Sequence, residues 1–373
     1  MRALPRLANR VTEQPTPPSG DVDRVRMSRE PTSGAEGADV TVGIPTWNRS
    51  ELLGKAITSV LQQSYRRFTV VVSDNASDDD TASLVRSFRD PRLVYRPLER
   101  NIGRHANFNR LIELAETEFV VLLGDDDELR PGHLSLTVDA LKRWPTAGVA
   151  HTGCVIVDRH DKTLVPHARL MKTEQSTGFE PGTQFLERGM RAGWMMCMSS
   201  ATFRKAALVD GGGVRPEDGF IDDFALLMRI ATKWDFAYVN QPLALMRAHD
   251  EASSSAHGSF TPGGYRQARS QPDMLYEQRR RFLDEADLPE MQARRLERIA
   301  ERTHRRDVVG HLSTRATTGD GVGVMFRALG RELRRDHRMG LDPVTWRFVV
   351  GQLGGRRLRD GARRALEPAR HRQ

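Results

Sequence analysis

The stretch FVVLLGDDDEL, residues Phe119–Leu129, decides how this sequence folds, because an apolar run there ends in three adjacent carboxylates. The five residues FVVLL have the length and composition of a buried strand. Asp125, Asp126 and Asp127 come immediately afterwards. Carboxylates held side by side at a strand end repel one another, and a bound Mg²⁺ or Mn²⁺ is the usual way to neutralise them. The stretch therefore predicts a strand that delivers a metal site, and the alternative interpretation is a solvated acidic loop.

The composition describes a globular protein with an uneven charge. The chain has 373 residues, of which 38% are hydrophobic, and a net charge of +8. Residues 265–373 hold 25 arginines and 15 acidic residues, a balance of +10, so the first 264 residues carry −2. The basic character therefore belongs to the C-terminal region.

Cysteine usage and hydropathy bear on the compartment. The two cysteines, Cys154 and Cys197, exclude a disulfide framework and fit a reducing cytoplasm. No run approaches the ~18 apolar residues of a membrane-spanning helix, and no apolar segment follows Arg2 and Arg6 as in a secretory signal. We expect a cytoplasmic protein that is soluble or peripheral at the inner face of the membrane.

Three compositional zones suggest the domain organisation. Residues 1–38 are rich in Pro, Ser, Gly, Arg and Glu without any period, which predicts a disordered leader. Residues 39–262 alternate strand-like and helix-like runs, which is typical of an α/β domain with a mixed sheet flanked by helices. We divide it into halves at 39–130 and 131–262. Residues 263–373 are Arg-rich and helical in pattern, which predicts a C-terminal helical appendage.

The pattern of the first half predicts strands that are joined by crossover helices. Val40–Ile44 is a predicted strand, and Asn48 stands three residues before Glu51, a spacing suited to a helix capping box. A helix with an apolar stripe should follow, and Phe68–Ser73 is the next strand. A crossover of this length pairs the two strands in parallel.

Polar residues follow each predicted strand of this half. Asp74–Asp78 should open a second helix, a third strand comes at Leu93–Arg96, and Asn101–Gly103 leads into a third helix that ends before Phe119. Ligands of open α/β sheets bind outside the carboxyl ends of the strands. We therefore expect Pro45–Asn48, Asp74–Ser77 and the Asp triplet to converge on one crevice.

Four motifs in this half resemble a known family. They are VTVGIPTWNRSELLGKAITSVLQQSY, VVVSDNASDDDT, ERNIGRHANFNRLIELA and VVLLGDDDEL, in this order over about ninety residues. Together they resemble the family 2 glycosyltransferases, which have the Rossmann-like GT-A fold and bind a nucleotide-diphosphate sugar across the strand ends.

The resemblance implies roles for the residues at the strand ends. Gly124 stands where many members carry a further Asp, so which neighbour shares the metal with Asp126 stays open. The implied nucleotide-sugar contacts are Pro45, Thr46, Asn48, Asp74, Asn101, Gly103 and Asp125, and the implied metal ligands are Asp126, Asp127 and His249.

Elementary chemistry supports part of this assignment and leaves alternatives. A carboxylate at a helix N-terminus, as we expect for Asp74, stays ionised and accepts a base N–H well. Asp74 could equally be a helix cap, although Ser77 or Asp78 also fits that position. Gly103 either permits a positive φ beside the ligand or only breaks the loop.

The second half should bind the acceptor and supply the base. Trp194 is a sugar-stacking candidate, and a core tryptophan is the alternative. Asp222 and Asp223 stand in the first turn of a predicted helix and resemble the family's acidic pair, whose second member is the catalytic base. We choose Asp223 as the base before Asp222; helix-dipole stabilisation is the alternative for both. Glu217-Asp218 is a third choice.

An Arg-x-His motif ends this half. The resemblance makes His249 a metal or diphosphate contact and Arg247 a counter-charge for phosphates, whereas a lone surface His is the alternative. The Ser-rich loop that follows could close over a bound donor.

The sequence as a whole predicts an inverting, metal-dependent glycosyltransferase that moves a sugar from a nucleotide-diphosphate donor to an acceptor hydroxyl. Bacterial glycan, glycolipid or glycosylated-metabolite synthesis is the expected setting, and a catalytically inactive nucleotide-sugar-binding or scaffold protein is the alternative. The basic C-terminal region could contact a membrane or be a solvated helix on the catalytic domain. Its few aromatic residues argue against nucleic-acid binding.

Overall fold

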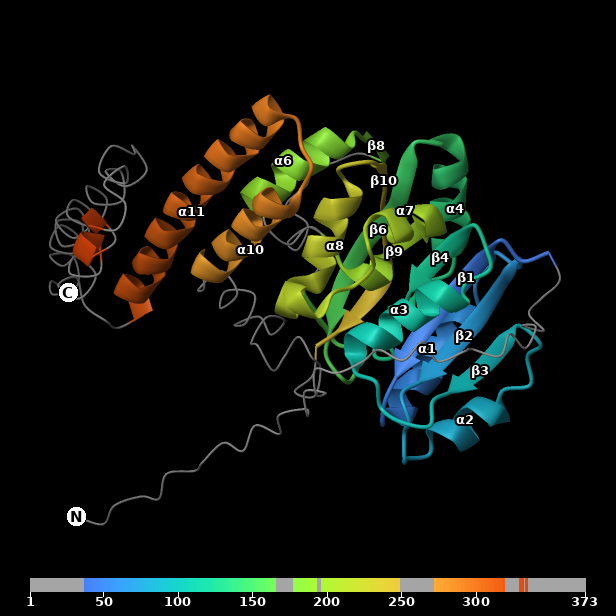
Figure 1. The fold of residues 1–373 in the computed structure, drawn as a ribbon. Coiled ribbons are helices and arrows are strands. Elements are labelled where there is room, and N and C mark those ends of the chain that lie inside the picture. Colours follow the sequence, from blue (N-terminus) through green and yellow to red (C-terminus); the bar gives the residue numbers. More distant parts are fainter. Residues whose placement is uncertain are drawn as a thin grey trace, which may run out of the picture. The chain divides into compact units, whose positions relative to one another are not determined.

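The computed structural model describes residues 37–165, 177–192, 196–248, 272–318, 329–331 and 333–334. Within these residues, ten strands form one mixed sheet (Figure 1) in the order β3-β2-β1-β4-β9-β6-β10-β5, with β7 paired to β6 and β8 to β10. The strands are β1 (Val40–Thr46), β2 (Phe68–Asp74), β3 (Leu93–Pro97), β4 (Phe119–Leu122), β5 (Glu128–Leu129), β6 (Ala147–Val157), β7 (Thr163–Val165), β8 (Gly178–Glu180), β9 (Ala201–Arg204) and β10 (Asp235–Arg247).

Helices flank the sheet, and short 3-10 turns precede β9 and α8. α3 contacts β1, β2 and β4, whereas α4 contacts β6, β9 and β10. The helices are α1 (Ser50–Leu61), α2 (Thr81–Ser87), α3 (Arg104–Leu114), α4 (His133–Arg143), α6 (Gly182–Ala192), α7 (Lys205–Asp210), α8 (Asp222–Ile230), α10 (Pro272–Glu285) and α11 (Glu290–Thr318), with 3-10 turns η1 (Met198–Ser200) and η2 (Pro216–Ile221).

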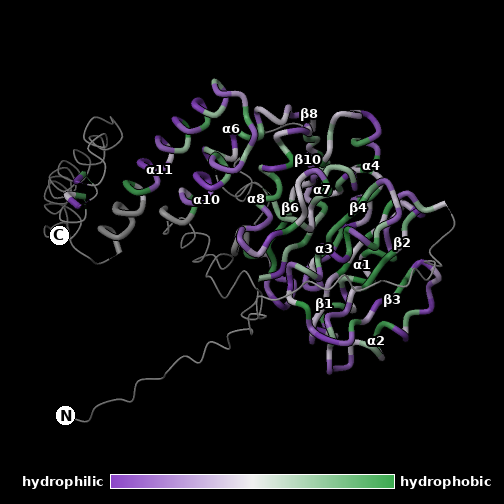
Figure 2. Tube along the Cα trace, in the orientation of Figure 1, coloured by the Kyte–Doolittle hydropathy of each residue, from purple (hydrophilic) through white to green (hydrophobic). Residues whose placement is uncertain are grey.

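The first four strands are parallel, and β1, β2 and β4 are almost completely buried. β1 pairs with β2 and β4, and β2 pairs with β3, all in parallel. Every residue of β2 and β4 is buried, because helices cover the sheet and each strand reads as a nearly continuous apolar run. Figure 2 shows the apolar colour concentrated along these strands. The predicted α/β fold with a mixed sheet is confirmed, and so is the predicted parallel pairing.

The second half enters the sheet through an antiparallel strand. β9 lies between β4 and β6 and runs antiparallel to both. β6 and β10 then pair in parallel over most of their length, with register shifts around Pro242. The carboxyl ends of β6 and β10 therefore point to the same edge of the sheet as those of β1, β2 and β4.

The C-terminal helices pack on the second half of the sheet domain. α10 contacts α8, α11 contacts α6, and Phe282, Leu296 and Ala300 join the main apolar core. In the described ranges, none of the helices is both long and apolar enough to span a membrane. The predicted domain boundary at residue 263 lies outside the described residues, as do the predicted leader up to residue 36 and the Ser-rich loop.

Two helix starts differ from the sequence-based expectation. α1 begins at Ser50 with Arg49 as its N-cap and without a side-chain cap, so the capping box expected from Asn48 and Glu51 is wrong. α2 begins at Thr81 rather than within Asp74–Asp78. Asn48 bonds to the loop after β2 instead of to its own helix, whereas Asp79 accepts hydrogen bonds both from the Ser50 amide of α1 and from the Thr81 amide of α2.

Candidate active site

The carboxyl ends of β1, β2 and β4 bring three predicted site residues together. Thr46 and Asp74 are register partners at the ends of β1 and β2. The Thr46 hydroxyl donates to Asp125 Oδ2 at 2.8 Å, across the end of β4. All three side chains are nearly buried, so the sheet itself fixes their spacing.

The loops after β1 and β2 are bound to each other. Asn48 has a positive φ of 53° and accepts, through its side-chain oxygen, a 2.9 Å hydrogen bond from the Asp78 amide. Its own amide donates to Ser77 Oγ at 2.9 Å, and the Ser50 amide donates to Asp79 at 3.0 Å. These bonds form one rim beside the strand ends, and Asp79 also accepts a 3.0 Å hydrogen bond from the Thr81 amide at the start of α2.

Asp74 is held inside this rim. Its carboxylate accepts hydrogen bonds from the Ser77 amide at 2.9 Å and from the Tyr95 hydroxyl at 2.5 Å. Because α2 starts only at Thr81, Asp74 does not lie at a helix N-terminus, and that part of the sequence argument is wrong. Burial, together with the bond to Asp74, raises the pKa of Tyr95, so this tyrosine stays a donor.

Asn101 and Gly103 continue the rim on the side of β2. Asn101 Oδ1 accepts hydrogen bonds from the Asn75 side chain and from the Gly103 amide, both at 2.8 Å. Gly103 has a φ of 86° and precedes the first residue of α3. The positive φ, one of the two alternatives for this glycine, is therefore the observed conformation, and L side chains rarely adopt it.

Arg49 lies between the first two acids of the triplet. Its Nη1 atom is 3.2 Å from Asp125 Oδ1 and 3.1 Å from Asp126 Oδ2. The side chain of Asp126 is 17% exposed and that of Asp125 9% exposed, so the pair faces partly into solvent. The positively charged guanidinium of Arg49 thus occupies the point on which one oxygen of each carboxylate converges.

Asp127 turns away from this pair. Its carboxylate accepts a hydrogen bond from the Ser199 hydroxyl and another from the Arg247 amide at 3.0 Å. Burial, reinforced by the neighbouring charge of Asp126, raises the pKa of both Asp125 and Asp127. A cation bound in this loop would stabilise the ionised forms of these carboxylates.

Gly124 is required by the crowding of these carboxylates. A Cβ atom at this position would lie 2.9 Å from Asp126 Oδ1 and 3.2 Å from Asp127 Oδ2. An aspartate there, as many family members carry, would force the triplet to rearrange. The absence of a Cβ atom at residue 124 therefore leaves room for the carboxylates of Asp126 and Asp127.

The residues at this edge fit a divalent ion in chemistry, although the ligand set is small. Among the described residues, no group of three His, Cys, Asp or Glu side chains is arranged around one metal position. Carboxylate oxygens are the ligands that Mg²⁺ and Mn²⁺ prefer, and such ions keep several waters or substrate phosphate oxygens. Asp125 and Asp126 suit that kind of open site once Arg49 moves aside.

Arg247 has partners that differ from the predicted ones. The side chain is 1% exposed and forms ion pairs with Glu128 and, at 2.6 Å, with Asp161. Its Nε also donates to the Asp126 carbonyl at 3.2 Å. These contacts make Arg247 a brace under the acidic loop, and they leave its guanidinium poorly placed for the predicted phosphate contact.

The acidic pair of α8 is tied to the start of α3. Asp222 is 2% exposed, forms an ion pair with Arg104 and lies 3.3 Å from His105 Nε2. Burial opposes ionisation, but His105 and Arg104 hold the pKa of Asp222 below its usual range. Asp223 is half-buried, and its carboxylate accepts a 2.7 Å hydrogen bond from the Phe224 amide.

The Gly-rich loop before α8 is held by α3 and by α8 itself. Asn109 of α3 accepts from the Val214 amide and donates to its carbonyl, and Arg229 of α8 forms a 2.8 Å ion pair with Asp218. Asp218, from our third-choice Glu-Asp pair, is thus committed to this loop. Two other predicted residues, Trp194 and His249, lie outside the described residues.

The sheet, with acidic side chains at its strand ends, defines an α/β protein with a mixed sheet. Residues 41–208 match the model of glycosyl transferase family 2. This part, somewhat less than half of the chain, is similar to that family, in agreement with the four sequence motifs.

Known relatives match the same part of the chain. The chain is 39% identical over 123 residues to the Campylobacter jejuni GalNAc(5)-diNAcBac-PP-undecaprenol beta-1,3-glucosyltransferase. The matched residues make up 31% of this chain and 38% of that protein. It is 27% identical over 139 residues to the Salmonella typhimurium abequosyltransferase RfbV, 35% of this chain and 40% of that protein. The matches thus span about two fifths of these relatives' own length.

Solved structures share the fold over a larger part. S. aureus TarS 1-349 superposes with a TM-score of 0.53 at 18% identity, covering 74% of this chain and 79% of that one. The mannosyltransferase PcManGT from Pyrobaculum calidifontis, in complex with GDP-Man and Mn2+, gives 0.52 at 19% identity, covering 87% and 91%. At such identities the likeness establishes the GT-A fold alone.

Several side chains at this edge escaped the sequence analysis. Arg104 and His105 lie within the third motif that carried the resemblance, where we selected Asn101 and Gly103 instead. Arg49 follows directly on the first motif's Asn48. Their positions were visible in the sequence, but their acidic partners lie far along the chain. Ser199 carried no signal that the sequence analysis used.

Proposed function

We propose that this protein is an inverting, metal-assisted glycosyltransferase that uses a nucleotide-diphosphate sugar and an acceptor hydroxyl. The observation that carries the proposal is the convergence of Thr46, Arg49, Asp125 and Asp126 beside Asp74 at one edge of the sheet. Such an edge supplies acceptors for a base and a ribose, and charge for a diphosphate.

Donor binding would use the rim and the strand ends. Asp74 would accept the ring N–H of the base, and Asp125 would contact the ribose. Support comes from the fixed position of both carboxylates, which lose little freedom on binding. Further donor contacts would come from Pro45, Thr46, Asn48, Asn101 and Gly103.

The metal would be held by Asp126 together with Asp125. Asp127 is the weaker candidate, because Ser199 and the Arg247 amide already occupy its carboxylate. A bound Mg²⁺ or Mn²⁺ would neutralise the charge that develops on the departing nucleoside diphosphate. Arg49 would leave the acids and turn toward the phosphates, while Arg247 braces the loop from below. We retain His249 as a proposed metal or diphosphate contact.

Asp223 would act as the general base. It takes the proton from the acceptor hydroxyl, whose oxygen then bonds to the anomeric carbon as the bond from that carbon to the diphosphate oxygen breaks. Attack from the face opposite the leaving group inverts the anomeric configuration. Asp222 is the less suitable base, because Arg104 and His105 hold it ionised and occupied. It would instead position the first turn of α8.

The proposed acceptor and product rest on the names of the relatives. The relatives' names describe a glucosyltransferase for a PP-undecaprenol-linked glycan and an abequosyltransferase, which favours a bacterial glycan, glycolipid or glycosylated metabolite as product. Trp194 remains the proposed sugar-stacking residue. We propose a cytoplasmic enzyme.

A peripheral membrane contact through α10 and α11 is less favoured than a solvated helix pair. Many of their arginines pair with acids of the same helices, as in Arg294–Glu290 and Arg280–Glu297. Paired arginines leave little net charge for an anionic lipid surface. No nucleic-acid partner is proposed.

A panel of nucleotide-sugars with Mn²⁺ tests the proposal. A donor that binds should raise the melting temperature by mass action, and a competent enzyme should slowly release nucleoside diphosphate by hydrolysis or transfer. Stabilisation without any release, across all acceptors tried, would favour the alternative of an inactive nucleotide-sugar-binding protein. The absence of stabilisation by every donor would contradict the proposal itself.

A further inference from the structure

The second half of the protein carries a pocket that the proposed reaction does not use. It lies between α6 and α11 and has a volume of about 840 Å³. α6 packs on β10. The lining residue Glu180 pairs with Phe236 near the start of β10, whereas the acidic loop bonds to Arg247 at the end of the same strand. The pocket is therefore separate from the strand-end site. Its lining residues are Glu180, Thr183, Gln184, Glu187, Arg188, Arg191, Ala192, Arg295 and Arg306.

One pair in the pocket is purely structural. Arg188 Nε lies 2.8 Å from Glu180 Oε1, and its Nη2 lies 2.5 Å from Glu180 Oε2. Both side chains are largely buried, with exposed fractions of 16% and 8%. This bidentate pair forms the floor of the pocket and is satisfied without a ligand.

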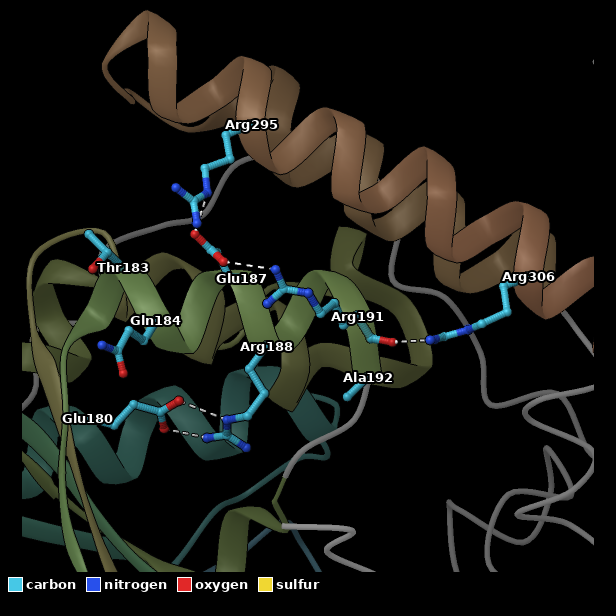
Figure 3. Close-up of a pocket in the computed structure, with 9 residues that line it drawn as sticks. All are labelled: Glu180, Thr183, Gln184, Glu187, Arg188, Arg191, Ala192, Arg295 and Arg306. Atoms are coloured by element: carbon cyan, nitrogen blue, oxygen red, sulfur yellow. Dashed lines mark hydrogen bonds and ion pairs between the residues drawn. The ribbon is translucent and has the colours of Figure 1, made fainter. Parts of the chain in front are cut away.

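The remaining charges are unbalanced. Arg191 and Arg295 share a single carboxylate, that of Glu187, at 3.0 Å and 2.6 Å. Arg306 donates to the Arg191 carbonyl at 3.0 Å, and its ion-pair partner Asp307 is 3.8 Å away and outside the lining. Figure 3 shows Arg295 and Arg306 reaching from α11 toward α6, with Glu187 between Arg295 and Arg191. Two guanidinium groups thus share one carboxylate, and a third, that of Arg306, lies further along α11 against the Arg191 carbonyl.

The Glu187 carboxylate, an oxyanion of the protein itself, bridges the guanidinium groups of Arg191 on α6 and Arg295 on α11. Arg191, Arg295 and Arg306 each keep about half of their side-chain surface exposed, so they are accessible from solvent. Guanidinium groups match the geometry of phosphate oxygens and can each donate two parallel bonds. The volume exceeds the space that one carboxylate requires and is typical of a small-molecule site.

We propose that the α6–α11 pocket is a second anion site that takes a phosphate or diphosphate group. Among the described residues its lining holds arginines and no aromatic side chain on which a base could stack, so we assign it a phosphate rather than a nucleoside. α6 belongs to the proposed acceptor half and contacts α8, whose first turn holds Asp222 and Asp223. The inference does not require that the proposed transfer reaction is correct.

Titration calorimetry of the full-length protein with inorganic pyrophosphate, in EDTA, tests this site. EDTA removes divalent ions, so the acidic strand-end site repels the probe. The R295Q/R306Q variant should bind pyrophosphate at least about tenfold more weakly. The matched control R294Q/R298Q removes two exposed arginines of the same helix outside the pocket and should leave the affinity unchanged.

A second variant changes the affinity in the opposite direction. Glu187→Gln removes the carboxylate that competes for Arg191 and Arg295, so pyrophosphate should bind about threefold more tightly or better. A network that only fastens α11 to α6 would not give this gain. Absence of binding to the wild type, equal losses in the two double variants, or weaker binding by Glu187→Gln would each overturn the proposal.

Vesicles distinguish the source of the phosphate. Phosphatidylcholine vesicles containing phosphatidic acid should retain the wild type and release R295Q/R306Q if the ligand is a lipid-borne phosphate. Pyrophosphate binding without vesicle binding supports a free phosphate or diphosphate instead. R295Q/R306Q should keep the thermal stabilisation by nucleotide-sugar and Mn²⁺, which separates failure of this site from failure of the proposed reaction.

Discussion

Arg49 and Asp126 are joined across the ends of β1 and β4, with Arg49 Nη1 3.1 Å from Asp126 Oδ2. The same nitrogen lies 3.2 Å from Asp125 Oδ1, so the guanidinium occupies the point at which a metal would be shared. Burial raises the pKa of Asp125, and an adjacent positive charge offsets this effect. Arg49 is therefore a built-in competitor for the proposed metal.

Arg49→Gln should tighten Mn²⁺ binding in the absence of nucleotide, by about three- to tenfold, because it removes the competing charge at a partly exposed ion pair. Free Mn²⁺ measured by electron paramagnetic resonance gives the affinity directly. Arg66→Gln, which changes an exposed arginine elsewhere, should leave it unchanged. Weaker Mn²⁺ binding by Arg49→Gln would show that the arginine supports the metal site instead.

Asp126 and Asp223 should separate donor binding from turnover. Asp126→Ala should weaken Mn²⁺-dependent binding of a nucleotide-sugar by about tenfold or more, because it removes a proposed ligand. Asp223→Asn should leave that binding nearly intact and lower kcat by about 10²- to 10⁴-fold, as expected for loss of a general base. Calorimetry and steady-state kinetics check both, and equal losses of binding would contradict the assigned roles.

The sheet could be predicted because its strands are encoded locally. FVVLL at Phe119 and FTVVVS at Phe68 are buried on both faces, so each appears in the sequence as an uninterrupted apolar run. Parallel pairing then followed from the length of the crossover, and it carried the Asp triplet to the correct edge.

The contacts within the site could not be predicted, because they join distant parts of the chain. Arg49 meets Asp126 across 77 positions, Ser199 meets Asp127 across 72, and Arg104 meets a carboxylate 118 positions away. No local period records such pairs. The same reason explains the misplaced helix starts, since Asn48 bonds to the amide of Asp78 rather than within its own helix.

Arg104→Gln should lower the free energy of unfolding by about 2 kcal/mol at pH 7, because it leaves the Asp222 carboxylate buried with less compensation. The pKa of Asp222 is lowered in the folded state, so its ionised form stabilises the protein above the unfolded pKa. The difference between variant and wild type should therefore shrink as the pH falls below about 4. Urea unfolding at several pH values measures it.

The double variant Arg104→Gln with Asp222→Asn checks the cause. Removing the charge from the buried carboxyl should recover part of the lost stability, because no unpaired charge remains. Arg100→Gln, on the exposed loop before α3, should change the unfolding free energy by less than about 0.5 kcal/mol. A double variant no more stable than Arg104→Gln alone would rule out the ion pair as the source.

Two buried histidines should make the protein sensitive to acid. His133 and His151 are 0% and 1% exposed, and burial lowers the pKa of each to about 3. The nearby charge of Arg188 adds to the effect at His151. Because both rings are neutral in the folded state but protonate near pH 6.5 once unfolded, the unfolded chain binds more protons between about pH 6.5 and 3. The stability that these two neutral rings contribute is therefore fully present above about pH 6.5, and it is lost as the pH falls through this window.

His151→Leu should flatten this pH dependence, because it replaces the titrating ring with an apolar side chain of similar volume in contact with Tyr238. The slope of unfolding free energy against pH should fall by about 1 kcal/mol per pH unit near pH 5. His160→Gln, at an exposed position, is the control and should keep the wild-type slope. Chemical unfolding at pH 7, 6, 5 and 4 gives both slopes, and an unchanged slope for His151→Leu would mean that its imidazole is protonated within the fold.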